Sequence, residues 1–229
     1  MRIALLLTLS LLGACGGPTS EPSAQAEAPP EGVERWEEEI QAFDDANAEN
    51  PPAKGQIVFT GSSSARRWPL EESFPDLDVL NRGFGGSEIS DTIYYAERFL
   101  FPLEPRIIVF YAGDNDIGHG ESPESVSEDY RTFAAMVHEA LPETRIAYIA
   151  VKPSLKRWNL IEQVRKANGL IQAQTEADPL ADFVDIAGPM IGDDGKPRPE
   201  LFVEDGLHLT AEGYALWASI LRPYLVEGE

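Results

Sequence analysis

The sequence predicts an α/β fold in which helices cover both faces of a parallel β-sheet. Along the chain, short apolar runs rich in β-branched residues alternate with longer amphipathic segments, and this alternation is typical of strands joined by crossover helices. The run at 106–112, RIIVFYA, is apolar toward both faces, as a central parallel strand should be. A length of 229 residues and a hydrophobic content of 43% suffice for one domain with a sizeable core.

The individual elements follow from the hydrophobic pattern and from its interruption by Gly and Pro. Strands are predicted at 57–59, 77–80, 106–112, 145–151 and 183–186. Helices are predicted at 36–50, 89–101, 122–141, 160–177 and 210–225. Neither an internal repeat nor a second domain is predicted.

The N-terminal residues are expected to direct the chain to the cell envelope. Residues 1–14 combine a basic second residue with a leucine-rich run too short to span a bilayer, as a signal peptide does. The sequence LGAC, ending at Cys15, resembles the lipobox of bacterial lipoproteins. This resemblance implies cleavage before Cys15, lipid attachment to it, and a protein facing the periplasm or the cell exterior. An ordinary secretory signal with a spare cysteine is the alternative.

A flexible tether is predicted between this signal and the folded domain. Residues 15–33 are rich in Pro, Ala, Ser and Glu and cannot bury enough surface to offset their ordering entropy. Trp36, Ile40 and Phe43 then recur at helical spacing, which places them on one helix face. We expect this helix to cover the domain, which is predicted to span 34–229.

The net charge of the chain indicates which partners it is not expected to bind, a point that concerns nucleic acid and membranes. Acidic residues outnumber basic ones by 39 to 18, giving a formal net charge of -21. At physiological salt this charge repels polyanions over about 8 Å, so we expect no nucleic-acid partner and no membrane contact beyond the lipid anchor. With Cys15 as its single cysteine, the chain has no intramolecular disulfide and no cysteine-based metal cluster.

Polar groups suited to acyl transfer occur in four turns, which follow predicted strands or precede the last helix. The turns are 61–64 (GSSS), 81–86 (NRGFGG), 113–116 (GDND) and 205–208 (DGLH). Ligands of open parallel sheets bind just beyond the carboxyl ends of the strands. A serine placed there is displayed toward whatever the protein binds or cleaves.

These residue types match the needs of a nucleophilic serine. A serine hydroxyl is a weak nucleophile until a base takes its proton and a third group orients that base. His208 and Asp205, three residues apart in one turn, suit both tasks. The N–H of Gly86, the amide of Asn115 and the N–H of the serine offer three donors to an oxyanion. Taken alone, the first turn is also consistent with a plain connection in which Gly61 forms the turn and a serine caps the next helix.

In this order and spacing, the four turns resemble the sequence blocks of the SGNH hydrolases, also called the GDSL lipases and esterases. The resemblance covers about 36–225 and implies a flavodoxin-like three-layer α/β/α sandwich with strand order 2-1-3-4-5. It implies Ser63 as nucleophile, His208 as base and Asp205 as the acid that orients it. It further implies an oxyanion hole formed by Ser63, Gly86 and Asn115, and neither a metal nor another cofactor.

One position departs from the family pattern. The family's Gly-Asp-Ser is replaced by Gly61-Ser62-Ser63, so the choice of Ser63 rests on alignment, and Ser62 and Ser64 stay open as alternatives. The replaced aspartate is not a reacting group in the family, and activity is still expected.

Other polar residues are weaker candidates for a functional role. Asp114, Asp116 and the pair at 193–194 suggest a Mg²⁺ or Ca²⁺ site, but so acidic a chain collects carboxylates in its loops by chance. His119 and His138 are expected to lack partners, with His138 at a helix surface. Residues expected near the pocket mouth, as substrate contacts or in ion pairs, are Arg66, Arg67, Trp68, Lys152 and Ser154. Residues expected in the core or at a pocket wall are Trp158, Met190 and Phe202.

These observations predict a lipid-anchored serine esterase. Its substrate would be a carboxylic ester, either a small acyl or acetyl ester, a lipid or an acylated glycan, cleaved through an acyl-enzyme. An envelope acyltransferase with the same residues and a non-catalytic carbohydrate-binding lipoprotein are the alternatives. The intact set of four turns argues against the second, because a scaffold has no need to keep these side chains together.

Overall fold

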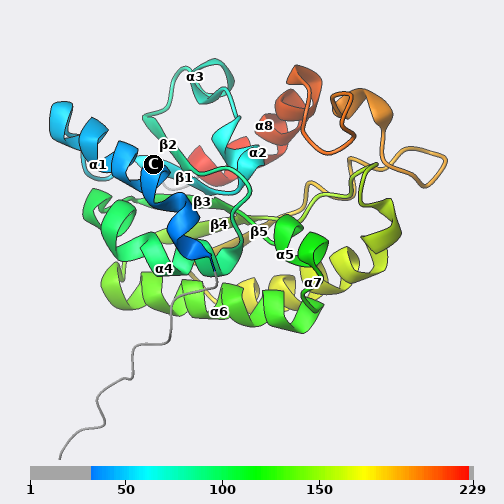
Figure 1. Cartoon of the computed structure of the whole chain (residues 1–229). Helices are drawn as coiled ribbons and strands as arrows, with labels where there is room; N and C mark the ends of the chain where they lie inside the picture. Colours follow the sequence, from blue (N-terminus) through cyan, green and yellow to red (C-terminus); the bar gives the residue numbers. More distant parts are fainter. Residues whose placement is uncertain (1–31, 227–229) are drawn as a thin grey trace, which may run out of the picture.

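The computed structural model describes residues 32–226 and contains one five-stranded parallel sheet between two helical layers (Figure 1). The strands are β1 (Ile57–Gly61), β2 (Val79–Gly83), β3 (Ile107–Tyr111), β4 (Arg145–Ile149) and β5 (Ala181–Val184). Their order, β2-β1-β3-β4-β5, confirms the predicted flavodoxin-like sandwich. β1 and β3 are buried at every residue, as expected for central strands with helices on both faces.

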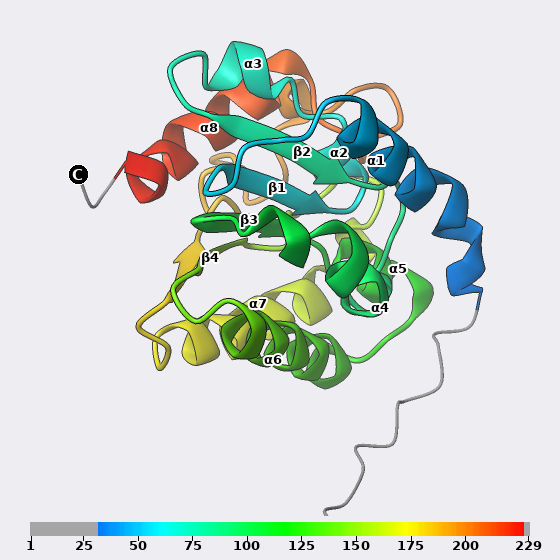
Figure 2. The same ribbon diagram turned by 90° about the vertical axis from the view of Figure 1, so that its left-hand side faces the viewer.

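Two groups of helices cover the sheet (Figure 2). One face carries α2 (Ser63–Arg66), α3 (Leu70–Ser73) and α8 (Ala211–Val226). The other carries α4 (Ile89–Phe99), α6 (Pro123–Ala140) and α7 (Ile161–Thr175), with the short α5 (Asp114–His119) at the edge of the sheet. Short 3-10 turns occur at Val33–Trp36, Phe101–Leu103, Trp158–Leu160 and Pro199–Leu201.

The strand pleat divides the apolar side chains between two cores, because successive side chains point to opposite faces. Phe59 faces α2 and α8, where it packs on Trp68 with 5.4 Å between ring centroids. Phe110 faces the other layer and packs on Phe133 of α6 at 4.2 Å.

The predicted N-terminal cover is α1 (Glu37–Glu49), which packs against α4. Ile40 is fully buried, and Phe43 stacks on Phe99 at 5.9 Å between centroids. Val33, predicted as the last tether residue, is 3% exposed and belongs to the core. The predicted signal peptide, Cys15 and the tether up to residue 31 lie outside the described residues.

Some boundaries differ from the prediction. β2 begins two residues later than predicted and runs on through Asn81 and Arg82. Polar residues fit there because β2 is an edge strand, so their side chains reach neighbouring helices instead of a core: Arg82 contacts Asn47 of α1. β5 lies two residues earlier than predicted. Within residues 32–226, no helix combines the length and apolarity needed to span a membrane.

Candidate active site

The end of β1 sets the direction in which the serine turn leaves the sheet. Gly61 has φ +110°, and a Cβ on it would lie 2.0 Å from the carbonyl oxygen of Tyr111 in β3. Ser62 N–H donates to that same carbonyl at 2.8 Å. Because only glycine tolerates this approach, the chain turns at once into α2, and Ser63 becomes its first residue.

The structure brings Ser63, His208 and Asp205 together in one hydrogen-bonded chain. Ser63 Oγ lies 3.0 Å from His208 Nε2, and His208 Nδ1 lies 2.6 Å from Asp205 Oδ2. The other carboxylate oxygen of Asp205 accepts the N–H groups of Leu207 and His208 at 2.8 and 2.9 Å. Asp205 therefore shapes the turn and orients the imidazole at the same time.

The ionisation of Asp205 fixes the proton arrangement of this chain. Burial acts to raise the pKa of Asp205, but the hydrogen bonds from His208 and Leu207 outweigh it and hold the pKa well below its usual value. An ionised carboxylate only accepts hydrogen bonds, so His208 Nδ1 carries the proton. His208 Nε2 is then free to accept the proton of Ser63.

The three adjacent serines occupy different environments. Ser62 is 2% exposed, and its carbonyl accepts from the N–H groups of Ala65 and Arg66 at 2.9 and 3.1 Å. Ser64 is 1% exposed, and its Oγ has no hydrogen-bond partner within residues 32–226. Of the three hydroxyls, only that of Ser63 contacts His208.

Asn115 and the turn containing Gly86 are joined to each other by a hydrogen bond. Asn115 lies in the first turn of α5 and is 7% exposed. Its Nδ2 donates to the carbonyl of Ser87 at 3.0 Å, one residue after Gly86, whose φ is +88°. An amide nitrogen carries two hydrogens, so Nδ2 retains one for a ligand.

Asp116 locks the turns before α4 and α5 to each other. Its Oδ1 accepts the N–H of Ile89 at 2.9 Å, and its Oδ2 accepts the N–H of Gly113 at 3.0 Å. Burial raises the pKa of Asp116 to about 7, against the effect of its backbone hydrogen bonds. Carboxylate oxygens of Asp116, Glu121 and Asp129 lie within 4.8 Å of one another, but the backbone bonds already engage both oxygens of Asp116.

Asp114 is the centre of a buried charge cluster. It pairs with Lys152 and with Arg157, and the hydroxyl of Tyr111 lies 3.3 Å from its Oδ2. Burial acts to raise the pKa of Asp114, but the two adjacent cations outweigh it and hold the pKa below its usual value. Lys152 is 2% exposed. Of the two roles predicted for Lys152, the structure therefore supports the ion pair.

Two residues with clear contacts to the site were missed by sequence reasoning. Arg157 Nη2 donates to Asn115 Oδ1 at 3.1 Å, across 42 positions of sequence. Asn81 Nδ2 donates to the carbonyl of Ala65 at 2.8 Å and so holds the end of α2. Asn81 belongs to the NRGFGG turn and carried a signal there, whereas no local pattern marks Arg157.

The prediction that His119 and His138 lack partners is wrong. His119 Nδ1 lies 2.5 Å from Glu88 Oε1, and His138 Nε2 lies 2.7 Å from Asp178 Oδ2. Both contacts join elements distant in sequence, which the pattern within one helix does not reveal.

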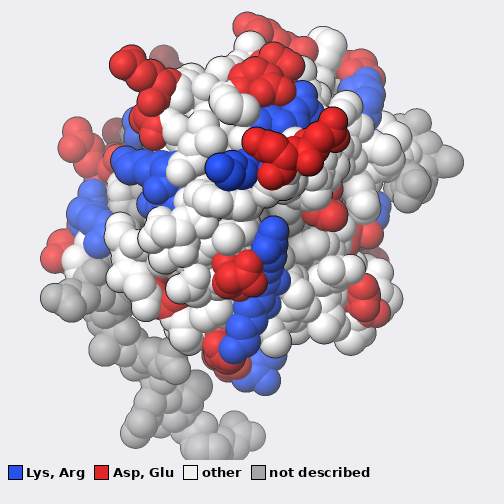
Figure 3. Space-filling model, turned by 90° about the vertical axis from the view of Figure 1, so that its right-hand side faces the viewer, with Lys and Arg blue, Asp and Glu red and all other residues white. Residues whose placement is uncertain are grey.

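Of the remaining predicted residues, some are exposed and others buried, but Trp158, predicted in the core or at a pocket wall, is half-buried and belongs to neither core. Arg66 is exposed and lies over Gly85, where an added Cβ would meet its Nη1 at 2.7 Å. Met190 and Phe202 are buried in the core beneath α8, and so is Trp68, contrary to the prediction that it lies near the pocket mouth. On the side of the molecule that carries α5 and the loop after β5, acidic and basic side chains are interspersed with uncharged surface (Figure 3).

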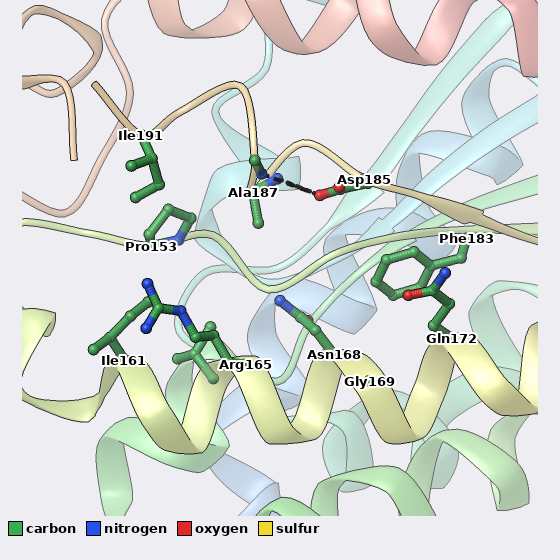
Figure 4. A pocket seen from close by; sticks show the side chains of 12 residues that line it. Pro153, Ile161, Arg165, Asn168, Gly169, Gln172, Phe183, Asp185, Ala187 and Ile191 are labelled. Atoms are coloured by element: carbon green, nitrogen blue, oxygen red, sulfur yellow. Dashed lines mark hydrogen bonds between the residues drawn. The ribbon is translucent and has the colours of Figure 1, made fainter. Parts of the chain in front are cut away.

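A cavity of about 350 Å³ lies between α7 and the loop that follows β5 (Figure 4). Across the cavity, Asn168 of α7 faces Ala187 of the loop, while Gln172 of α7 lies toward Phe183 of β5. No member of the Ser63–His208–Asp205 chain lines this cavity. The segment after β4 borders both places, because Pro153 lines the cavity while Leu155 lies against Gly206 of the histidine turn.

Comparisons with known proteins identify the family of the chain. The model of the GDSL-like lipase/acylhydrolase family matches residues 46–216, a span that includes all the residues of the site described above. No curated protein sequence matches the chain.

Solved structures share the fold at low sequence identity. A Streptococcus pneumonia protein provisionally assigned as a platelet activating factor is 22% identical with a TM-score of 0.75, over 84% of this chain and 94% of that chain. A provisionally assigned acylhydrolase from Bacteroides fragilis is 20% identical with a TM-score of 0.70, over 81% and 94%. A GDSL-like lipase from Bacteroides thetaiotaomicron is 19% identical with a TM-score of 0.69, over 81% and 96%. With the family model spanning most of the chain, the protein belongs to the GDSL-like lipase/acylhydrolase family, whose members hydrolyse esters.

Proposed function

We propose that the protein is a serine esterase that cleaves a carboxylic ester through an acyl-enzyme intermediate. The observation that carries this proposal is the hydrogen-bonded chain from Ser63 through His208 to Asp205, with contacts of 3.0 and 2.6 Å. Both distances are within the reach required of a nucleophile, its base and the group that orients the base.

In the first step, Ser63 Oγ attacks the ester carbonyl while His208 Nε2 takes the hydroxyl proton. The imidazolium that forms is stabilised by the ionised Asp205 carboxylate on its Nδ1–H. Collapse of the tetrahedral intermediate breaks the bond to the alcohol oxygen, which receives the proton from His208 Nε2. The acyl group then remains on Ser63.

The tetrahedral oxyanion is stabilised by donors at the same edge of the sheet. We assign this role to the N–H groups of Ser63 and Gly86 and to the second Nδ2 hydrogen of Asn115. Loss of one such donor typically lowers kcat by about 10²- to 10³-fold. In the second half of the reaction, His208 activates a water molecule that attacks the acyl carbonyl and releases the acid.

The substrate we propose is a small acyl or acetyl ester, a lipid or an acylated glycan. Two exposed apolar side chains flank the histidine turn and suit the apolar part of such an ester. Leu155 and Val203 are each 40% exposed. Leu155 lies against Gly206, and Val203 N–H donates to the His208 carbonyl at 2.9 Å.

The assignment of Ser63 is tested by alanine substitution of each serine. Ser63→Ala is expected to lower kcat for p-nitrophenyl esters by at least about 10³-fold. Ser62→Ala and Ser64→Ala are matched controls that should keep most activity, because neither hydroxyl contacts His208. Turnover by Ser63→Ala comparable to wild type would show that the assignment is wrong.

Three assays of the wild-type protein distinguish an esterase from an acyltransferase and from a non-catalytic binding protein. Short- and long-chain p-nitrophenyl esters and acetylated glycans, assayed side by side, define the acyl group and the alcohol. An acyl product on an added acceptor alcohol would indicate an acyltransferase. Absence of labelling by a serine-reactive fluorophosphonate would favour a carbohydrate-binding lipoprotein.

We also propose that the protein is anchored to the cell envelope by lipid at Cys15. The support is the LGAC sequence after a short leucine-rich run. Metabolic labelling with a radioactive fatty acid should mark the wild-type protein and not Cys15→Ser. Equal labelling of the two would refute the attachment site.

A further inference from the structure

We propose that Arg157 is a positioning residue that aims the Asn115 amide at the oxyanion, an inference that rests on the esterase function proposed above. Arg157 lies in the segment between β4 and α7. Its Nη2 donates to Asn115 Oδ1 at 3.1 Å. Its Nη1 donates to the carbonyl and the carboxylate of Asp114 at 2.8 and 2.5 Å. One guanidinium thus holds both the backbone and the side chains at the start of α5.

The direction of the Asn115 amide depends on this contact. Ser87 accepts one Nδ2 hydrogen at 3.0 Å, and Arg157 engages the oxygen on the other side of the amide. Because the amide is planar, these two contacts together fix where the second Nδ2 hydrogen points. Donors that are already aimed when charge develops stabilise a transition state better than donors that must reorient.

Arg157 is itself held in place by the buried cluster. Asp114, kept ionised by its two cations, binds Lys152 as well as Arg157. α5 leaves space for the guanidinium at Gly118, where an added Cβ would lie 2.7 Å from Arg157 Cζ and Nε. The side chain of Arg157 is 18% exposed, so the contact to Asn115 is largely protected from water.

A structural role and a positioning role for Arg157 predict different kinetics. If Arg157 only stabilises the fold, its loss lowers the unfolding temperature and leaves kcat of the folded protein unchanged. If it positions Asn115, its loss lowers kcat, leaves KM nearly unchanged, and has no effect once Asn115 is absent.

The test is a double-mutant cycle on p-nitrophenyl acetate hydrolysis with Arg157→Lys and Asn115→Ala. Lysine keeps the charge near Asp114 but lacks the planar fork that contacts two residues at once. Arg157→Lys is expected to lower kcat about tenfold, as for one hydrogen bond to a charged group, with KM within about twofold. The double variant should match Asn115→Ala alone. Multiplicative losses, or wild-type kcat in Arg157→Lys, overturn the proposal.

A second variant and a control variant distinguish the positioning role of Arg157 from a general effect on folding. Gly118→Ala removes no hydrogen-bonding group but places a Cβ 2.7 Å from Cζ and Nε of Arg157, so kcat should fall in a variant that is still folded at the assay temperature. Wild-type kcat in Gly118→Ala counts against the proposal. Arg98→Lys is the matched control, because Arg98 also bridges several partners, Glu37 and Asp44 of α1, but lies outside the site. Its kcat should stay at the wild-type value.

The failure of this inference is distinguishable from failure of the proposed function. If Ser63→Ala abolishes turnover and the cycle is multiplicative, only the role of Arg157 is refuted. If the wild-type protein cleaves no ester, crystal structures of wild type and Arg157→Lys decide: a turned or disordered Asn115 amide in the variant supports positioning, and an unmoved amide overturns it.

Discussion

Asp116 makes a testable contribution to the pH dependence of folding. The residue is fully buried, and burial raises its pKa from 3.8 to about 7, with the charges of Glu121 and Glu88 adding to the shift and backbone N–H groups opposing it. Between these two pH values, folded Asp116 holds a proton that the unfolded chain has released. The free energy of unfolding therefore falls as pH rises from about 4 to about 7, and this contribution is constant above that range.

The magnitude follows from the size of the shift. Each pKa unit corresponds to about 1.4 kcal/mol, so the whole range amounts to about 4 kcal/mol and the part between pH 5 and pH 8 to about 3 kcal/mol. Because Asp116 is fully buried, solvent screening reduces this value little. This loss of folding free energy concerns the turns before α4 and α5, since Asp116 binds the backbone N–H groups of Ile89 and Gly113 there.

Urea unfolding of wild type and Asp116→Asn at pH 5 and pH 8 measures this contribution. Asparagine does not titrate, so the variant should lose about 3 kcal/mol less stability than wild type between the two pH values. Asp193→Asn, at an exposed position, is the control and should keep the wild-type difference. If Asp116→Asn shows the same loss as wild type, another group is responsible and the reasoning fails.

Two further predictions concern the turns of the site. Asp205→Asn should lower kcat by about 10²- to 10⁴-fold, because an amide does not enforce the Nδ1–H tautomer of His208. Its stability in urea should change little, since the remaining oxygen still accepts the Leu207 N–H. A kcat within tenfold of wild type would contradict the role of Asp205. Gly61→Ala should destabilise the protein by about 3 kcal/mol or more in urea, because its Cβ would meet the Tyr111 carbonyl. Gly195→Ala, also at positive φ but with open space around it, should cost only about 1 kcal/mol, and equal losses at the two positions would show that the close approach is unimportant.

The sequence predicts those features whose cause is local. RIIVFYA identifies a central strand because a strand buried on both faces must be apolar on both, and β3 is buried throughout. The spacing of Asp205 and His208 places carboxylate and imidazole in one turn, where they lie 2.6 Å apart. The predicted range of β2 began and ended too early, because an edge strand accepts polar residues such as Arg82. A prediction from apolar runs does not include such residues.

Features that depend on distant contacts were not predictable in this way. Arg157 meets Asn115 only because β3 and β4 are neighbours in the sheet, and an arginine in a loop has no local signature of such a contact. The partners of His119 and His138 were missed for the same reason. Lys152 was placed at the correct edge, but the choice between substrate contact and ion pair required its burial and its pairing with Asp114.

The backbone explains how one of three identical side chains is singled out. Gly61 must turn left-handed to clear the Tyr111 carbonyl, which then binds the N–H of Ser62. The carbonyl of Ser62 accepts the N–H groups that open α2, so Ser62 and Ser64 face inward while Ser63 faces His208. At position 62, where the resemblance to the SGNH hydrolases implies an aspartate, Ser62 is 2% exposed, and a carboxylate would need a partner for its charge. A neutral hydroxyl avoids that requirement, so a serine at position 62 is compatible with the nucleophilic role proposed for Ser63.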